Sequence, residues 1–160
     1  MPSSQNVIID IFLYQELFGK KNKWRYKNIN KVSNFLKENP LFFFATTEGD
    51  QPRVRALAFS TEYEGKLFLG LGNHKEVYKQ LQANPKFELC CLAKDGTYLR
   101  VTGTARFQQE EKVAERVFEN FPHLRTFYTQ PEGPRIATFF VEKGKAVFAN
   151  MTGNLEEITL

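Results

Sequence analysis

Hydrophobic and polar residues change their spacing along the chain, and the change separates a helical N-terminal part from a longer part rich in strands. Residues 7–18 place apolar side chains at helical spacing and predict a short amphipathic helix, and a second helix is expected over residues 31–38. The segment "GKKNKWRYKNIN" (19–30) between them is predicted to be a basic linker. From Leu41 onward the apolar residues recur at the shorter spacing of strands.

Short turn signals separate the apolar runs after Leu41. Gly or Asp-Gly occurs in "TEGDQ", "YEGK", "KDGT" and "EKGK", and each signal lies between runs rich in Phe, Val, Leu and Thr, which predicts a β-hairpin. In "YLRVTGTARF" (98–107) apolar and polar residues alternate, so one face of this strand is expected to lie in the core. Seven strands are expected, over residues 41–47, 53–61, 66–71, 86–93, 97–107, 135–142 and 145–150.

Two helices are expected to interrupt these strands. Asn73 is a favourable N-cap and Glu76 follows three residues later, so a helix is predicted to begin at His74. The other is expected over residues 110–121. Seven short antiparallel strands with few helices predict a mainly β fold, in which the sheet forms a closed or partly closed barrel because closure removes exposed edges.

Composition indicates one globular domain with a basic leader. The chain has 160 residues, of which 42% are hydrophobic and 14% aromatic, which is enough for a core. Its net charge of +4 is concentrated at the start, because residues 1–31 hold six of the 22 Lys and Arg residues but only two of the 18 acidic residues. The rest of the chain is balanced in charge. A nucleic acid or an anionic surface is therefore a weak candidate partner, limited to the leader.

The two cysteines and the first apolar run place the chain in the class of soluble, reduced proteins. Cys90 and Cys91 are adjacent on an expected strand, so their side chains point to opposite faces and both are expected to be reduced and buried. No spacing of ligand residues indicates a metal site. The run from Val7 to Leu13 is broken by Asp10 and lacks the flanks of a signal peptide, so a cytoplasmic protein without a membrane span is expected.

Two arginines are candidates for anion binding. Arg53 and Arg55 lie two positions apart in "PRVRALAFS", so on a strand their side chains project from one face. Neighbouring guanidinium groups repel each other unless a negative group is present, and arginine fits a phosphate as a fork. One interpretation is an ordinary solvated strand end, with the arginines paired to Glu62 or Glu64 across the hairpin. The other is a phosphate site.

Lys75 supports the phosphate interpretation. It lies in the first turn of the helix expected from His74, where the partial positive charge of the helix end disfavours a cation unless an anion is near. The hairpin that follows Arg53 is expected to bring this helix end beside the start of the arginine strand. Backbone N–H groups, one lysine and one or two arginines would together bind a phosphate monoester.

The segment "GDQPRVRALAFSTEYEGKLFLGLGNHKEVYKQLQANPKFELCCL" resembles the FMN-binding split barrels of the pyridoxamine 5'-phosphate oxidase-like superfamily, especially the small proteins grouped with nitroimidazole-resistance proteins. The shared features are Asn39-Pro40, the "P-x-V-R" strand, the lysine between strand and helix, Asn84-Pro85 and the "LRVTG" strand. The resemblance extends from about Ile29 to the C-terminus. A leader of residues 1–28 and a split-barrel domain of residues 29–160, with about six to seven antiparallel strands, are therefore expected.

The resemblance implies that FMN binds across the interface of a homodimer. For the phosphate it implies Arg55, with Arg53 as a helper, and the run Asn73, His74 and Lys75. For the isoalloxazine ring it implies the backbone of Ala56, Leu57, Phe68 and Leu69, together with Tyr98 of the partner subunit.

The sequence departs from the family pattern in four places. His74 replaces a residue that is commonly basic or hydroxylated, and Leu69 and Leu71 stand where relatives often offer threonine or serine to the flavin edge. The chain also ends at "GNLEEITL", without the arginine and histidine that grip the substrate in the vitamin-specific oxidases. A pyridoxamine phosphate oxidase is therefore not expected.

The resulting hypothesis is an FMN-dependent oxidoreductase of unknown substrate, in which the flavin carries the redox chemistry. No side chain is committed by its sequence context to acid–base catalysis, so the catalytic residues are left open. A non-catalytic protein that stores or senses FMN is an alternative, and a split barrel that uses F420 or haem is another.

Overall fold

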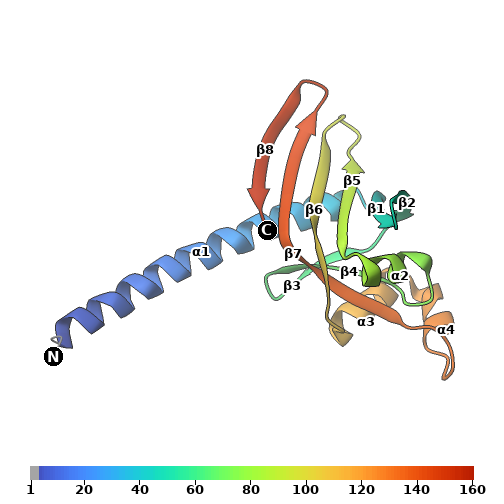
Figure 1. Ribbon diagram of the computed structural model, residues 1–160, viewed down its shortest axis with the longest axis horizontal. Helices are drawn as coiled ribbons and strands as arrows, with labels where there is room; N and C mark the ends of the chain where they lie inside the picture. Colours follow the sequence, from blue (N-terminus) through green and yellow to red (C-terminus); the bar gives the residue numbers. More distant parts are fainter. Residues whose placement is uncertain (1–3) are drawn as a thin grey trace.

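The computed structural model describes the backbone of residues 4–160 and the side chains of residues 19, 20 and 22–160. Figure 1 shows a long N-terminal helix, a sheet of long strands and a group of short helices at one end of the sheet. The elements are α1 (Ser4–Glu38), β1 (Phe42–Glu48), β2 (Gln51–Leu57), β3 (Ser60–Tyr63), β4 (Lys66–Gly72), α2 (Glu76–Ala83), β5 (Lys86–Leu92), β6 (Tyr98–Phe107), α3 (Glu111–Asn120), the 3₁₀ turn η1 (Pro122–Leu124), α4 (Arg125–Tyr128), β7 (Ile136–Asn150) and β8 (Gly153–Thr159).

The sheet is an antiparallel split barrel. Its strands follow the order β2–β1–β5–β6–β7–β4–β3, and β8 pairs with β7. β7 has two neighbours on one side, because residues 136–140 pair with β4 and residues 145–150 pair with β8. The ends of the path, β2 and β3, are consecutive in the chain but are not paired, so the sheet does not close. The mainly β split-barrel prediction is confirmed, with eight strands instead of six or seven.

α1 is one continuous helix, so the predicted division into a helix over 7–18, a basic linker and a helix over 31–38 is wrong. The basic segment is rich in lysine, a good helix former, and contains no proline that would stop the helix. Among the α1 side chains that the structure describes, those of the C-terminal part enter the core, since Ile29, Val32 and Leu36 are buried while residues 22–27 are exposed. The rest of the helix projects away from the sheet (Figure 1).

Three of the four predicted turns are hairpins. Gly49, Gly65 and Gly96 all have positive φ angles in the turns β1–β2, β3–β4 and β5–β6, a conformation that glycine adopts without steric cost. The strand predicted over residues 53–61 is divided at Ala58 and Phe59 into β2 and β3. β2 pairs with β1, whereas β3 pairs with β4. Phe59 turns inward at this point and is buried.

The fourth predicted turn, "EKGK", is a bulge within β7. Lys143 has a φ of 51° there, and the pairing of β7 with β6 shifts register between Thr102 and Thr104 but continues on both sides. The expected strands 135–142 and 145–150 are therefore one strand, β7, and the bulge marks where β7 exchanges β4 for β8 as its neighbour. The last strand, β8, was not predicted.

Two groups of buried side chains hold the elements together. The larger lies inside the barrel and includes Phe42, Phe44, Leu89 and Phe139, against which α1 and α2 pack. The smaller lies between β4 and the α3–α4 segment, and comprises Phe59, Phe68, Val113, Val117, Phe118, Tyr128 and Ile136. Cys91 is buried as expected and Cys90 is half-buried, and both are free thiols. Within the residues described, no helix has the length and apolar character needed to cross a membrane.

Candidate functional site

Arg55 is the centre of a hydrogen-bond network between β2, β1 and α2. Its Nη1 donates to Thr46 Oγ1 (2.7 Å) and to the carbonyl of Phe44 (3.1 Å), and its Nη2 donates to Gln80 Oε1 (2.6 Å). Thr46 also donates to Gln80 Oε1 at 2.6 Å, and both of these partners are buried. The guanidinium group is thus held in one orientation by neutral acceptors.

The charge of Arg55 has no carboxylate partner among the described residues. Burial, and secondarily the charge of Arg53, lower the pKa of Arg55 below its ordinary value. The Nε–H and one N–H of Nη2 have no acceptor in the described part of the chain, since the guanidinium offers five donors and only Nη1 and one N–H of Nη2 are engaged. Two adjacent donors on a partly desolvated cation suit an oxyanion.

Arg53 is differently placed, although it projects from the same face. Its Nε and Nη2 both donate to Glu48 Oε2, at 2.8 and 2.5 Å, across the β1–β2 turn. The sequence predicted a carboxylate partner at Glu62 or Glu64, but Glu62 accepts instead from the backbone N–H of Gly65. The interpretation of a solvated strand end with paired charges therefore holds for Arg53, whose partner is Glu48. It does not hold for Arg55.

The start of α2 differs from the prediction. The helix begins at Glu76, its N-cap is Lys75, and no side chain caps it. Asn73 does not cap α2, because its Oδ1 accepts from the backbone N–H of Arg135 and its own N–H donates to the Arg135 carbonyl. These two bonds extend the β4–β7 pairing by one residue. The Asn73 side chain is therefore used by the sheet and does not cap α2 as expected. The side chain of Lys75 is exposed, and its ammonium group has no hydrogen bond or ion pair to any described residue.

A pocket of about 200 Å³ brings three of the predicted residues together. Ala56, Leu57 and Lys75 line it, and we call it the Lys75 pocket. Its remaining walls come from the β2–β3 connection, from β4, from the α3–α4 segment and from the start of β7: Ala58, Phe59, Gly70, Leu71, Gly72, Val117, Phe121, Leu124, Tyr128 and Ile136. The lining is mainly apolar, with Lys75 and Tyr128 as its polar side chains.

Phe68 and Leu69 do not line this pocket. Both are fully buried, in the smaller and the larger core group respectively. The part of β4 that borders the pocket is the following stretch, Gly70 to Gly72. His74 lies beside it, with its ring 5.8 Å from that of Tyr128 and 5.5 Å from that of Phe127.

Tyr98 lies at the far end of the sheet from the Lys75 pocket within one chain. It pairs with Ala149 of β7, whereas β4 pairs with residues 136–140 of that strand. Tyr98 also pairs with Leu92, which places the two side chains on one face of the sheet.

That face carries large exposed apolar side chains. Phe43, Val54 and Leu92 are 55%, 68% and 66% exposed. Phe43 pairs with Ala56 and with Cys90, so these residues share the face with Tyr98. We call this surface the outer sheet face, and Ala56 connects it to the Lys75 pocket.

Sequence reasoning missed Thr46, Gln80 and Tyr128. Thr46 and Gln80 are ordinary polar residues in a strand and a helix, and Tyr128 lies in a segment for which no element was predicted. A signal for Tyr128 exists in the spacing of Val117, Phe121, Leu124 and Tyr128, which recur at helical intervals and turn one face toward the pocket.

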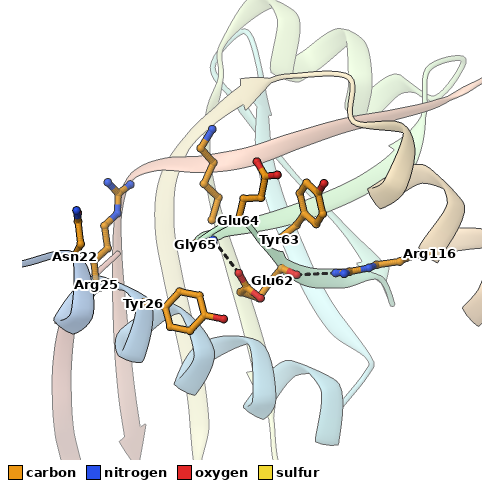
Figure 2. A pocket seen from close by; sticks show the side chains of 9 residues that line it. Asn22, Arg25, Tyr26, Glu62, Tyr63, Glu64, Gly65 and Arg116 are labelled. Atoms are coloured by element: carbon orange, nitrogen blue, oxygen red, sulfur yellow. Dashed lines mark hydrogen bonds between the residues drawn. The ribbon is translucent and has the colours of Figure 1, made fainter. Parts of the chain in front are cut away.

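A second hollow of about 470 Å³ lies between α1, the β3–β4 hairpin and α3 (Figure 2). Its charged groups hold the hairpin: Glu62 accepts from Gly65, and Arg116 donates to Thr61 Oγ1 and to the Glu62 carbonyl. None of the residues predicted to bind a cofactor lines it. Within the described part of the chain, no group of three or more His, Cys, Asp or Glu residues could hold a metal ion.

Comparisons with known proteins agree with this architecture. The family model described as pyridoxamine 5'-phosphate oxidase matches residues 29–146. A NimC/NimA family protein from Clostridium acetobutylicum has 33% sequence identity, and the match covers 88% of this chain and 99% of that chain with a TM-score of 0.77. No curated protein matches the chain.

More distant structures share the fold alone. General Stress Protein 26 from Bacillus anthracis is 14% identical over 82% of this chain and 98% of that chain, with a TM-score of 0.63. A pyridoxamine 5'-phosphate oxidase-related, FMN binding protein from Nostoc punctiforme is 12% identical over 82% and 95% of the two chains, with a TM-score of 0.51.

Proposed function

The chain belongs to the pyridoxamine 5'-phosphate oxidase family, and from this premise we propose that it is a flavoprotein that binds FMN and acts as an oxidoreductase. The observation that carries the proposal is Arg55, a partly desolvated guanidinium that has no carboxylate partner, and two N–H donors without an acceptor, among the described residues. A phosphate monoester would supply the missing negative charge and two acceptors.

Lys75 extends this phosphate site. It stands at the N-cap of α2, while Gln80 in the same helix holds Arg55, so α2 links the two cations. The positive end of the helix adds to their effect. Arg53, which is already paired with Glu48, is a weaker contributor.

The Lys75 pocket fits part of a flavin. Its apolar walls suit a flat ring, and its volume of about 200 Å³ is below the range of pockets that enclose a whole ligand of this size. Ala56 lines the pocket and also lies on the outer sheet face, so a second subunit on that face would complete the pocket.

We therefore propose a homodimer that associates through the outer sheet face. Exposed apolar residues gathered on one face indicate an interaction surface, and Phe43, Val54 and Leu92 form such a group. Tyr98 lies on this face and away from the pocket of its own chain, which is the placement required for a contact to the flavin of the other subunit. Closed twofold symmetry would provide two such sites.

In this proposal, FMN supplies the hydride or electron chemistry when bound. Arg55 and Lys75 hold the phosphate, the backbone of Ala56 and Leu57 supports the ring, and the α3–α4 wall excludes water. Lys75 and Tyr128 are the titratable groups in the lining, and no carboxylate or imidazole belongs to it. This lining also suits the second candidate function, in which the protein stores or senses FMN without turnover.

Absorbance and titration test the proposal. The purified chain should carry or take up flavin with a visible flavin spectrum, and should bind FMN at least tenfold more tightly than riboflavin, because a charge-assisted contact contributes about 1.5 to 3 kcal/mol. Absence of flavin binding, a haem band, or equal affinity for FMN and riboflavin would contradict it. Turnover of NAD(P)H with quinone or nitro acceptors would separate the oxidoreductase from the storage protein.

A further inference from the structure

Tyr128 is a buried tyrosine whose hydroxyl has no hydrogen-bond partner among the described residues. It is 5% exposed, lies at the end of α4 and packs in the smaller core group. Its ring contacts those of His74 and Phe127, but its hydroxyl makes no hydrogen bond to any described residue. A buried tyrosine normally finds a partner for its hydroxyl, so this hydroxyl is available to a partner outside the described residues.

The hydroxyl reaches open space in a pocket. Every fully enclosed side-chain nitrogen or oxygen in the described part of the chain has a hydrogen-bond partner, so Oη of Tyr128, which has none, is not fully enclosed. Tyr128 lines the Lys75 pocket and a neighbouring hollow behind α3. Burial raises the pKa of the tyrosine, so the hydroxyl keeps its proton and acts as a donor at neutral pH.

The packing around Gly72 directs the hydroxyl toward β4. A Cβ atom added to Gly72 would collide with Oη of Tyr128 and would lie 2.8 Å from Nδ1 of His74. The absence of a side chain at Gly72 therefore lets both polar atoms approach the strand beside the pocket. The ring contacts with His74 fix Tyr128 in this position.

The surroundings of Tyr128 suit a flat ring better than a phosphate. Val117, Phe121 and Leu124 lie on the same wall and offer no charge or donor to a dianion. The two phosphate-binding candidates lie on other elements, Arg55 on β2 and Lys75 at the start of α2. An isoalloxazine ring offers carbonyl oxygens and ring nitrogens as acceptors, which a single hydroxyl donor could satisfy.

We propose that the Tyr128 hydroxyl donates a hydrogen bond to an acceptor atom on the ring of the bound flavin, and so makes Tyr128 a ring-binding residue of the Lys75 pocket. This assignment rests on the proposed flavin function. It separates the site into a phosphate end, held by Arg55 and Lys75, and a ring end, held by Tyr128.

The test is the Tyr128→Phe variant, titrated with FMN and with riboflavin. The substitution removes no hydrogen bond between described residues, so the melting temperature should stay near that of the wild type. Loss of one neutral hydrogen bond should weaken both ligands by a similar factor of about two- to tenfold. The visible absorption bands of the bound flavin should also shift between the variant and the wild type. Tyr78→Phe is the matched control, because Tyr78 packs against Phe107 outside the pocket.

The two titrations and the flavin spectrum distinguish a ring contact from a phosphate contact and from no contact. A loss confined to FMN would assign Tyr128 to the phosphate and overturn the ring contact. Unchanged affinities and an unchanged flavin spectrum would show that the hydroxyl does not touch the ligand. If the wild-type chain binds neither ligand, the proposed flavin function itself fails, which is distinct from both results.

Discussion

Gln80 Oε1 accepts hydrogen bonds from both Arg55 and Thr46, and so connects α2 to β2 and β1 at one atom. The acceptor is an amide oxygen and carries no charge. It orients the guanidinium group without neutralising it, and a negative group that binds later meets the full charge of Arg55. The choice of glutamine over glutamate at this position therefore matters for anion binding.

Gln80→Glu should weaken FMN binding while preserving the fold. A carboxylate at this position would pair with Arg55 and repel the phosphate, so the affinity for FMN should fall by roughly ten- to a hundredfold, while riboflavin should bind as before. The free energy of unfolding should stay equal or rise, because a half-buried cation gains a partner. Calorimetric titration and chemical denaturation measure the two effects.

The control for this change is Gln82→Glu, which adds the same charge to an exposed position of α2. It should change FMN affinity by less than about threefold, since an exposed charge is screened by solvent. If both variants bind FMN as tightly as the wild type, Arg55 does not hold the phosphate.

Lys75→Ala should weaken FMN binding without changing the stability of the fold. The Lys75 side chain is exposed and has no partner among the described residues, so the melting temperature should not change, but the affinity for FMN should fall by about tenfold. Lys79→Ala is the matched control, because Lys79 lies one turn later in α2 and pairs with Glu76 at 2.7 Å. Equal FMN affinity in Lys75→Ala and Lys79→Ala would remove Lys75 from the site.

The local features of the fold could be predicted from the sequence because local residues determine them. The hairpin at Glu64-Gly65 is an example, since both residues adopt positive φ angles that the turn requires. The "EKGK" signal is equally strong at Lys143, yet it produces a bulge, because β6 runs past both halves of β7 and keeps them in one strand. Pairing with a distant strand is not visible in a local pattern.

In the candidate site, too, local sequence predicts some residues, and others depend on contacts between distant elements. Arg55 could be identified from its spacing and residue type, since a strand projects alternate side chains from one face. Gln80 could not, because its role depends on how α2 packs against the sheet. The helical spacing that includes Tyr128 indicates an apolar face, but the pocket that this face lines depends on how α4 packs against the sheet. The helix start was wrong for a related reason: Asn73 has the residue type of a cap, but its hydrogen bonds go to Arg135, which is 62 positions away.

Ile29 is the first buried residue among the described side chains of α1, and this position predicts where the chain can be shortened. Deletion of residues 1–21 should leave a cooperative transition and FMN binding, because neither the phosphate residues nor the Lys75 pocket lies in that segment. Ile29→Ala should instead lower the free energy of unfolding by about 2 to 5 kcal/mol, since Ile29 is fully buried. Thermal melting of both variants measures this, and a truncated chain that fails to melt cooperatively would place the whole helix in the folding unit.

Cys91 predicts a loss of stability in alkaline solution. Burial raises the pKa of its thiol from 9.0 to about 11, and the thiol donates to the Asn39 carbonyl at 3.1 Å. The unfolded chain releases this proton first, so the free energy of unfolding should fall as the pH rises from about 9 toward 11. Urea denaturation at pH 8 and 10 should show a smaller decrease for Cys91→Ala than for the wild type, and equal decreases would contradict the assignment.

The outer sheet face predicts how the proposed homodimer can be dissociated. Phe43 lies at the centre of this face, paired with Ala56 on one side and Cys90 on the other, and more than half of its side chain is exposed in the single chain. Phe43→Asp would bury a charge in the interface, so sedimentation at micromolar concentration should change from a dimer to the 18.6 kDa monomer.

FMN affinity should fall with dissociation, because Tyr98 of the partner subunit would no longer reach the pocket. Tyr26→Asp is the control, since Tyr26 is a half-exposed aromatic residue on α1, outside this face. A wild-type chain that sediments only as a monomer would refute the dimer, and a dimeric Phe43→Asp variant would place the interface on another surface. A monomeric variant that binds FMN as tightly as the wild type would show that one subunit forms the whole site, because the loss of Tyr98 of the partner subunit would then have no effect on the ligand.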